Sequence, residues 1–290
     1  MIIVDFNGIA ISAIVTQKID VKEDMIRHMI LNTIRMYNKK YRAEYGQLVV
    51  ACDSSTWRRD YFPEYKYKRR ESRADDQANE SKLDWNEVFR ILSLVLDEIR
   101  ANMPYKVVKV DKAEADDIVG VLAEMTQEFG KHEPVMIVSA DKDFVQLQKY
   151  SNIRQFSPLL KKEMIEKNPR NFLYEHIFKG DAGDGVPNIL SPDDTFVTGT
   201  RQKPVTAKKM QEWLSNAEKL ESFMDKVTYR NFVRNKKLID LSETPSALRE
   251  EIINNFESQT VAPNSRVLNY LIEKRCRMLI ESVGDFTNGN

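Results

Sequence analysis

Cysteine, histidine and long apolar runs are scarce in this chain of 290 residues. It has two cysteines, Cys52 and Cys276, and three histidines, so no Cys/His zinc cluster and no disulfide scaffold is expected. No window holds the roughly 20 consecutive apolar residues that a membrane helix needs. The apolar N-terminus lacks a basic region and is interrupted by Asp5, which favours a buried strand over a signal peptide. These absences indicate a soluble, cytoplasmic protein without a membrane partner.

Net charge is also missing, because 44 basic residues balance 44 acidic ones. Any charge signal must therefore lie in the distribution of the charges along the chain. Apolar residues make up 42% and charged residues 30%, the composition of an ordinary globular protein. The length allows one large domain or two modest ones.

Short β-branched runs alternate with helical patterns in the first half of the chain. Strands are expected at 2–4, 48–52, 107–110 and 135–138, and Asp20 with Glu23 suggests a capping box before the first long helix. This alternation predicts an α/β fold, with a mainly parallel central sheet covered by helices on both faces.

The second half is dominated by helical patterns. We expect a catalytic core at 1–165, which includes a long polar segment at 54–82, and a helical region at 166–290. A last helix carries apolar residues at 267, 268, 271, 272, 278 and 279 and is expected to pack back on the sheet domain.

Acidic residues follow all four expected strands. Asp5 and Asp53 end the first two strands, Glu114 follows the third and Asp141 follows the fourth, while Asp116, Asp117 and Asp143 add to the same edge. Ligands bind outside the carboxyl ends of the strands in open parallel sheets. Clustered carboxylates without His or Cys suit Mg²⁺ or Mn²⁺.

A single aspartate after a strand is more often a helix N-cap than a ligand, and Asp141 fits that reading. Four acidic strand ends in succession make a metal site the better interpretation. Glu114 and Asp116 can share a metal only if their helix begins at about that point, because residues two apart diverge by about 200° on a helix.

A third acidic doublet, Asp181 and Asp184, lies in the glycine-rich segment 180–188, called here the acidic turn. Taken alone it is a flexible loop with Asx-turns. A role in metal binding becomes the better interpretation if the turn folds over the edge of the sheet and supplies ligands for a second metal.

Two segments are basic. Residues 57–73 hold seven basic and three acidic residues with interleaved aromatics, a composition that suits single-stranded nucleic acid, and Lys66 and Arg69 would share a helix face. Residues 201–237 hold ten basic and four acidic residues. The second segment is equally compatible with a duplex-binding surface and with ordinary solvated helices.

The motifs at 3–7, 51–53, 114–117, 139–147 and 180–188 resemble the flap endonuclease/5′-nuclease family, of the PIN-like superfamily, in order and spacing. Residues 62–69 look like the entry to the helical arch of that family, so 54–82 is called the arch segment. The resemblance covers about residues 1–240. It implies that a helix–turn–helix element opens at Gly180 and grips the duplex backbone, and that the arch becomes helical over its substrate.

The resemblance also implies roles for individual residues. Asp5, Asp53, Asp116 and Asp141 would hold one Mg²⁺, supported by Glu114 and Asp117, and Asp143, Asp181 and Asp184 would hold a second, with Mn²⁺ as a substitute. The catalytic group is Lys66, Arg69, Asp141 and Asp143, in which the two basic residues steady the phosphate. The expected nucleic-acid contacts are Arg58, Arg59, Tyr65, Lys66, Arg69, Arg70, Lys208 and Lys209.

The implied activity is that of a 5′→3′ exonuclease and flap endonuclease with RNase H activity, which removes RNA primers and 5′ flaps during DNA replication. Branched or nicked duplex DNA and RNA–DNA hybrid are the expected partners of a monomer, with a single-stranded-DNA-binding protein as a candidate. A sliding-clamp contact is not expected, because the chain begins almost at its first strand.

Two alternatives stay open: a PIN-type endoribonuclease specific for single strands, and a non-catalytic protein that binds branched DNA. A haloacid-dehalogenase-type phosphatase is disfavoured, because it needs Asp-x-Asp at the first strand and Asn7 occupies the third position.

Overall fold

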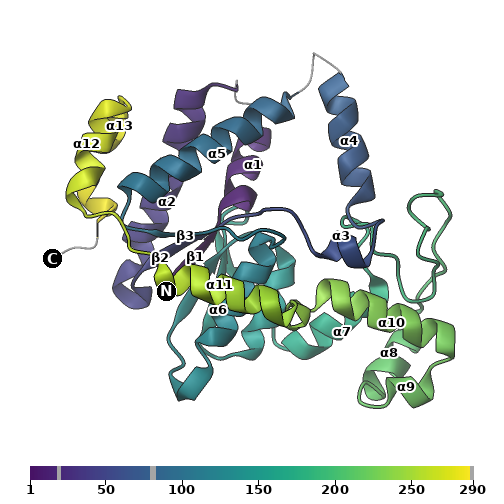
Figure 1. The fold of residues 1–290 in the computed structure, drawn as a ribbon. Coiled ribbons are helices and arrows are strands. Elements are labelled where there is room, and N and C mark those ends of the chain that lie inside the picture. The colour runs from purple at the N-terminus through teal and green to yellow at the C-terminus, as the bar shows by residue number, and fades with distance from the viewer. Residues whose placement is uncertain (18–20, 79–82, 288–290) are drawn as a thin grey trace.

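A central sheet of six strands organises the computed structural model, which describes residues 1–17, 21–78 and 83–287 (Figure 1). The strand order is β3-β2-β1-β4-β5-β6. The strands are β1 (Ile2–Asp5), β2 (Leu48–Ala51), β3 (Lys106–Val108), β4 (Val135–Val138), β5 (Ile153–Ser157) and β6 (Lys162–Met164). Only β6 runs antiparallel to its neighbour, so the expected mainly parallel sheet is confirmed.

The register brings the carboxyl ends of the inner strands to one edge. Asp5 pairs with Ala51, Ala51 pairs with Val108, and Val4 pairs with Val138. Residues that follow these strands therefore meet beside one another. The sequence predicted the four strands that supply acidic residues but did not predict β5 and β6, which follow them.

One face of the sheet is covered by α1 (Phe6–Gln17), α2 (Glu23–Tyr45) and α5 (Trp85–Asn102) (Figure 1). The 3.6-residue period places Ile26, Ile30 and Ile34 of α2 against the sheet, all nearly or fully buried. The expected cap residue Asp20 lies outside the described residues. Helix α2 begins at Glu23 after Lys22, whose side chain forms no capping hydrogen bond.

The single last helix that was expected is instead two helices, α12 (Ser265–Glu273) and α13 (Arg277–Ile280), and they pack on this face as the expected helix was to do. Their residues Val267, Leu271 and Leu279 are buried, whereas Leu268, Ile272 and Met278 are exposed. A buried ion pair fixes the contact: Glu98 of α5 accepts from Arg27 of α2 at 2.7 Å and from the Tyr270 hydroxyl at 2.7 Å.

The opposite face is covered by α6 (Ala115–Met125) and α11 (Ser246–Ser258) (Figure 1). After β4 the chain forms a 3₁₀ helix, η2 (Lys142–Lys149), where a short helix was expected. Other 3₁₀ turns are η1 (Glu128–Gly130), η3 (Leu241–Glu243) and η4 (Val283–Asp285).

A third apolar cluster joins the base of the arch segment to the C-terminal helices. Phe62 and Tyr65 pack with Phe178, Trp213 and Phe232. The elements are α3 (Arg58–Tyr61), α7 (Pro169–Lys179), α8 (Ala207–Ser215), α9 (Leu220–Phe223) and α10 (Lys226–Ile239). The helix–turn–helix expected to open at Gly180 is not seen there, because residues 180–206, all of them described, form turns, loop and one isolated β-bridge between α7 and α8.

The arch segment rises from α3 as helix α4 (Tyr67–Ala78), which points away from the sheet and towards the start of α5 (Figure 1). Among the described residues, no helix is both long and apolar enough to cross a membrane.

Candidate active site

Asp5 and Asp53 lie side by side where β1 and β2 end. Asp5 accepts hydrogen bonds from the Gly8 amide and from the Ser139 hydroxyl, each at 2.9 Å, and Asp53 accepts from the Ala115 amide at 2.8 Å. Burial and the charge of Asp53 raise the pKa of Asp5 to about 6. Burial also raises the pKa of Asp53. Asp5 is buried and Asp53 is half-buried, and two adjacent acids with raised pKa values favour the approach of a cation.

Asp116 and Asp141 complete this first acidic group. Helix α6 begins at Ala115, which meets the condition under which Glu114 and Asp116 can face one site. Burial and the charge of Asp141 raise the pKa of Asp116 well above its usual range. Asp141 is also the N-cap of η2, where it accepts from the Asp143 amide at 2.8 Å. The capping role and a place in the acidic group are therefore combined in one residue.

A second acidic group lies next to the first. It consists of Asp143, Asp181 and Asp184, which line one small cavity together with Asp116 of the first group, Arg58 and Tyr65. Burial and the charge of Asp141 raise the pKa of Asp143 to about 7. The charge of Asp141 thus raises the pKa values of Asp116 in the first group and Asp143 in the second. The acidic turn does fold over the edge of the sheet, because Asp181 and Asp184 share a cavity with Asp116 and Asp143.

Asp181 is held by donors from its own chain. It accepts from the amides of Gly183 and Asp184 at 2.8 and 3.1 Å and lies 3.0 Å from Nε2 of His176. The hydrogen bond from His176 is the main cause that holds the pKa of Asp181 far below its usual range. This carboxylate is therefore ionised and well oriented.

The base of the arch contributes cations to the acidic edge. Lys66 donates to Glu114 at 2.5 Å, and Arg69 donates to Asp184 at 2.8 Å. Burial raises the pKa of Glu114, but the charges of Lys66 and Arg58 outweigh it and lower the value to about 2. Arg69 stays half exposed, so it can also reach a ligand in solvent.

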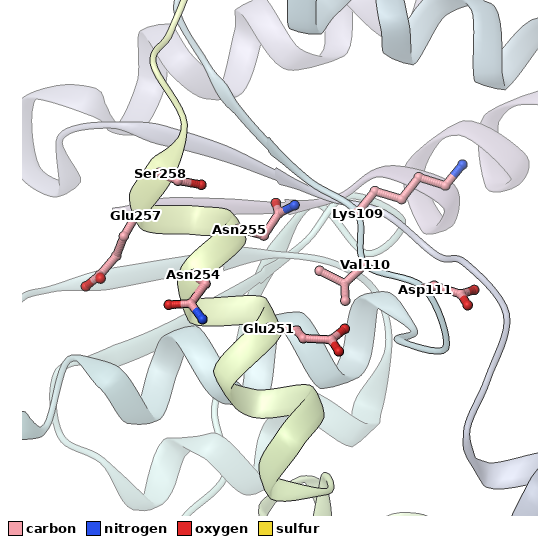
Figure 2. A pocket seen from close by; sticks show the side chains of 8 residues that line it. All are labelled: Lys109, Val110, Asp111, Glu251, Asn254, Asn255, Glu257 and Ser258. Atoms are coloured by element: carbon pink, nitrogen blue, oxygen red, sulfur yellow. The ribbon is translucent and has the colours of Figure 1, made fainter.

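A basic pocket opens beside Asp53 and Glu114. Its lining includes the side chains of Arg59, Lys66, Arg69, Arg70, Arg73 and Lys109. Arg59 and Arg70 were expected to contact nucleic acid, and the structure places both in this pocket. A separate pocket between the end of β3 and α11 is lined by eight residues, of which only Lys109 is shared (Figure 2).

Comparisons with known proteins agree with this architecture. Residues 1–174 match the family model described as 5′-3′ exonuclease, N-terminal resolvase-like domain, and residues 169–286 match T4 RNase H, C terminal. The Ribonuclease H of Enterobacteria phage T4 is 31% identical over 296 residues, 98% of this chain and 95% of that protein. The chain belongs to the 5′-3′ exonuclease family.

Further members of this family and similar folds extend the likeness. A 5′-3′ exonuclease of Mycoplasmopsis pulmonis is 29% identical over 79% of this chain and 71% of its own length. The T5 flap endonuclease, solved in a complex with DNA and metal ions, shares the fold with a TM-score of 0.60 at 17% identity, and covers 98% of both chains. The T5 5′-exonuclease solved with divalent zinc ions has a TM-score of 0.58 at 17% identity, over 99% of this chain and 98% of that one. The expected family is confirmed, and this chain is a nuclease.

The structure contradicts a surface role for Arg58 and Tyr65 in this family member. Arg58 is only 2% exposed and donates to Glu114, to Asp117 and to the Leu238 carbonyl. The Tyr65 hydroxyl donates to Glu114 or Asp184 inside the same cluster. Arg58 therefore holds Glu114 and Asp117 in place, Tyr65 contacts Glu114 and Asp184, and neither residue is available to stack on bases.

Asp117 is likewise a structural residue. It is fully buried and accepts hydrogen bonds from Trp57 and Thr244 on one oxygen and from Arg58 and the Glu114 amide on the other. Because both oxygens are occupied by protein donors, Asp117 is not free to ligate a metal. Its sequence neighbour Asp116 faces the cavity instead.

The second basic segment is only partly free. Lys208 and Lys209 are exposed in the first turn of α8. Arg230 and Arg234 pair with Asp193, and Lys236 and Lys237 pair with Glu243. Four of its ten basic residues thus have an acidic partner within the protein.

Two residues that contribute to the site were not predicted from the sequence. His176 lies between Asp143 and Asp181, although the small number of histidines had argued against imidazole ligands. Its position five residues before Asp181, in the last turn of a helix, is a signal that could have been used. Ser139 orients Asp5, and its position two residues before Asp141 was visible in the sequence.

Proposed function

We propose that this chain is a divalent-metal-dependent nuclease that removes 5′ flaps and RNA primers from duplex DNA. One observation carries the proposal: the carboxylates of Asp116, Asp143, Asp181 and Asp184 line one cavity, beside Asp5, Asp53 and Asp141. They come from segments far apart in the sequence. A fold that gathers so many acids at one edge needs a cation to offset their repulsion.

The donor set fits Mg²⁺, with Mn²⁺ as a substitute, because carboxylate oxygens dominate it. Asp5, Asp53, Asp116 and Asp141 would hold one ion, with Glu114 beside them. Asp143 and Asp184 would hold the other, with Asp181 acting partly through water. Two such ions supply an activated water and stabilise the leaving oxygen of a phosphodiester.

The residues of the arch would hold the substrate. Lys66 contacts Glu114 and Arg69 contacts Asp184, so a phosphate bound beside these carboxylates would find two donors in place. Arg59 and Arg70 would bind the neighbouring phosphates through charge. Lys208 and Lys209 would contact the duplex backbone, which positions the substrate without reading its sequence.

Relatives support the choice of substrate. One relative is named for ribonuclease H activity and another for 5′-3′ exonuclease activity, and a protein of the same fold was solved as a flap endonuclease with DNA. We place the enzyme in the cytoplasm as a monomer. A single-stranded-DNA-binding protein stays a predicted partner.

Cleavage of three substrates labelled at the 5′ end tests the proposal. A 5′-flap duplex, an RNA–DNA hybrid and single-stranded RNA are incubated with Mg²⁺ or with a chelator. Short 5′ products from the two duplex substrates, only with Mg²⁺, are expected. Cleavage of the single strand alone would support a PIN-type endoribonuclease, and tight flap binding without cleavage would support a binding protein.

Variants sharpen this assay. Asp141→Asn and Asp143→Asn should each lower the cleavage rate by about 10³-fold, since each removes a carboxylate that would hold a metal ion, and the charge of that ion would stabilise the transition state. Asp97→Asn is the matched control, because Asp97 is an exposed residue of α5 that pairs with Arg100. Equal rates for all three variants would contradict the proposed site.

A further inference from the structure

His176 occupies an unusual position at the second acidic group. It lies in the last turn of α7 and is only 7% exposed. Its Nε2 atom is 3.0 Å from Oδ2 of Asp181, and its Nδ1 atom is 3.3 Å from Oδ1 of Asp143. The imidazole ring therefore bridges two carboxylates that come from η2 and the acidic turn.

The hydrogen positions follow from the partners of each atom. Asp181 already accepts from two backbone amides, and Nζ of Lys142 is 3.5 Å away, so this carboxylate is an ionised acceptor. The Nε2 atom of His176 must then donate to it. In a neutral ring this leaves the Nδ1 atom with a lone pair and no proton.

That lone pair lies near another acceptor, because Oδ1 of Asp143 is 3.3 Å away. Nδ1 of His176 and Oδ1 of Asp143 are both buried, and neither has a hydrogen-bond partner among the described residues. Two unsatisfied acceptor atoms this close together in a buried site repel each other unless a positive charge lies beside both. This pair of unsatisfied atoms is evidence for a ligand, independent of the acidity of the cluster.

A metal ion satisfies this geometry. Two neighbouring ligands of an octahedral ion are about 3.0 Å apart when each bond is about 2.1 Å, close to the 3.3 Å between Nδ1 and Oδ1. A histidine that binds a metal through one ring nitrogen almost always donates the other N–H to a carboxylate or carbonyl. Asp181 is that carboxylate here, because it accepts the hydrogen bond from Nε2.

We infer that His176 binds, through Nδ1, the divalent ion held by Asp143, so that this position is a mixed nitrogen and oxygen site that selects transition metals over Mg²⁺. Imidazole is a better ligand for ions such as Co²⁺ than for Mg²⁺. Asp181 then orients the imidazole instead of binding the ion directly. The inference rests on the proposed function, because it assumes a metal at the second acidic group.

Electron spin-echo spectroscopy with Mn²⁺ tests the inference without any substitution. Protein labelled with ¹⁵N only in its histidine rings is compared with unlabelled protein, each with Mn²⁺ alone. A nitrogen modulation that changes with the label is expected. Bound Mn²⁺ without this modulation would overturn the inference.

Titration of metals into variants provides a second readout. His176→Gln should lower the affinity for Co²⁺ by about tenfold or more, and the affinity for Mg²⁺ by less than about threefold. His132→Gln, which removes an exposed imidazole, is the matched control and should change neither. Equal losses for both metals in His176→Gln would overturn the selectivity.

The two proposals fail separately. If the histidine modulation is absent but Mg²⁺-dependent flap cleavage is retained, only the proposed role of His176 is disproved. Absence of Mg²⁺-dependent cleavage in the wild-type protein would remove the proposed function, whatever the spectroscopy shows.

Discussion

The backbone N–H of Lys66 donates to the carbonyl oxygen of Asp184 at 2.7 Å. This bond ties the base of the arch to the acidic turn. Two side chains reinforce it, since Arg69 donates to the carboxylate of Asp184 at 2.8 Å and the Tyr65 hydroxyl lies 2.9 Å from it. One set of proposed metal ligands is therefore held against the base of the arch by hydrogen bonds.

A glycine makes this close contact possible, and a substitution tests it. Gly185 has φ +74°, and an added Cβ would lie 3.0 Å from the Glu64 carbonyl oxygen. Gly185→Ala should therefore push the arch base from the turn, lower flap cleavage by about tenfold or more and reduce the melting temperature.

Gly199→Ala is the matched control. It has the same backbone strain, with φ +70°, but open space around the new Cβ. The left-handed conformation costs each variant about 1–2 kcal/mol of stability. Only Gly185→Ala also disturbs the arch contact, so only this variant should lose cleavage. If both variants cleaved equally well, the arch contact would have no catalytic role.

A second glycine lies against Asp5. An added Cβ at Gly8 would lie 2.2 Å from Oδ2 of Asp5, so Gly8→Ala must displace that carboxylate. We expect an affinity for Mn²⁺ reduced by about 10-fold to 100-fold, with little change in stability, because alanine favours the helix by about 0.5–1 kcal/mol. Titration calorimetry measures the affinity, and Gly284→Ala, with open space around it, serves as control.

The buried pair of Arg58 and Asp117 should dominate the stability of the site. Its atoms are 2.9 Å apart, and its side chains are 2% and 0% exposed. Arg58→Met would leave Asp117 buried with fewer donors, which should lower the free energy of unfolding by about 3–5 kcal/mol. Denaturant unfolding measures this.

The exposed pair of Asp60 and Lys112 gives the comparison. Asp60→Ala removes an ion pair of 2.6 Å whose side chains are both more than half exposed, and it should cost less than about 1 kcal/mol. A similar cost for both variants would mean that Arg58 is not the structural residue described above.

Asp5 should make the metal-free protein less stable as the pH rises. Its pKa is about 6 in the folded chain, because of burial and the charge of Asp53, and about 3.9 in the unfolded chain. The folded state therefore binds more protons between these values. The stabilisation is complete below about pH 4 and is lost as the pH rises through about 6.

Comparison with Asp5→Asn isolates this contribution, because other acids with lowered pKa values, such as Glu98, act in the opposite direction. In the absence of metal, the variant should melt at a higher temperature than wild type at pH 7.5, and the difference should shrink towards pH 4. With Mn²⁺ added at pH 7.5 the order should reverse. A constant difference across the range would exclude titration of Asp5 as the cause.

Much of the acidic edge could be predicted, because each acidic residue lies close in the sequence to the strand that positions it. Residues 2–4, 48–52 and 135–138 are short β-branched runs, and each is followed by an acid. A parallel sheet brings the carboxyl ends of its strands to one edge, so Asp5, Asp53 and Asp141 had to meet there. The helical period likewise identified α2 and α5, because their buried residues recur every three or four positions.

Tertiary contacts decided the rest, since they join residues that no local pattern relates. Arg58 and Arg59 are adjacent basic residues in the sequence, yet the first is buried against Asp117 and the second faces a pocket. Asp116 and Asp117 differ in the same way, because one helical step turns one residue into the cavity and the other into the core. The sequence determined which chemical groups the chain carries and which strands present them. Packing alone determined which groups are free to bind a ligand, because burial and hydrogen-bond partners depend on contacts between distant segments.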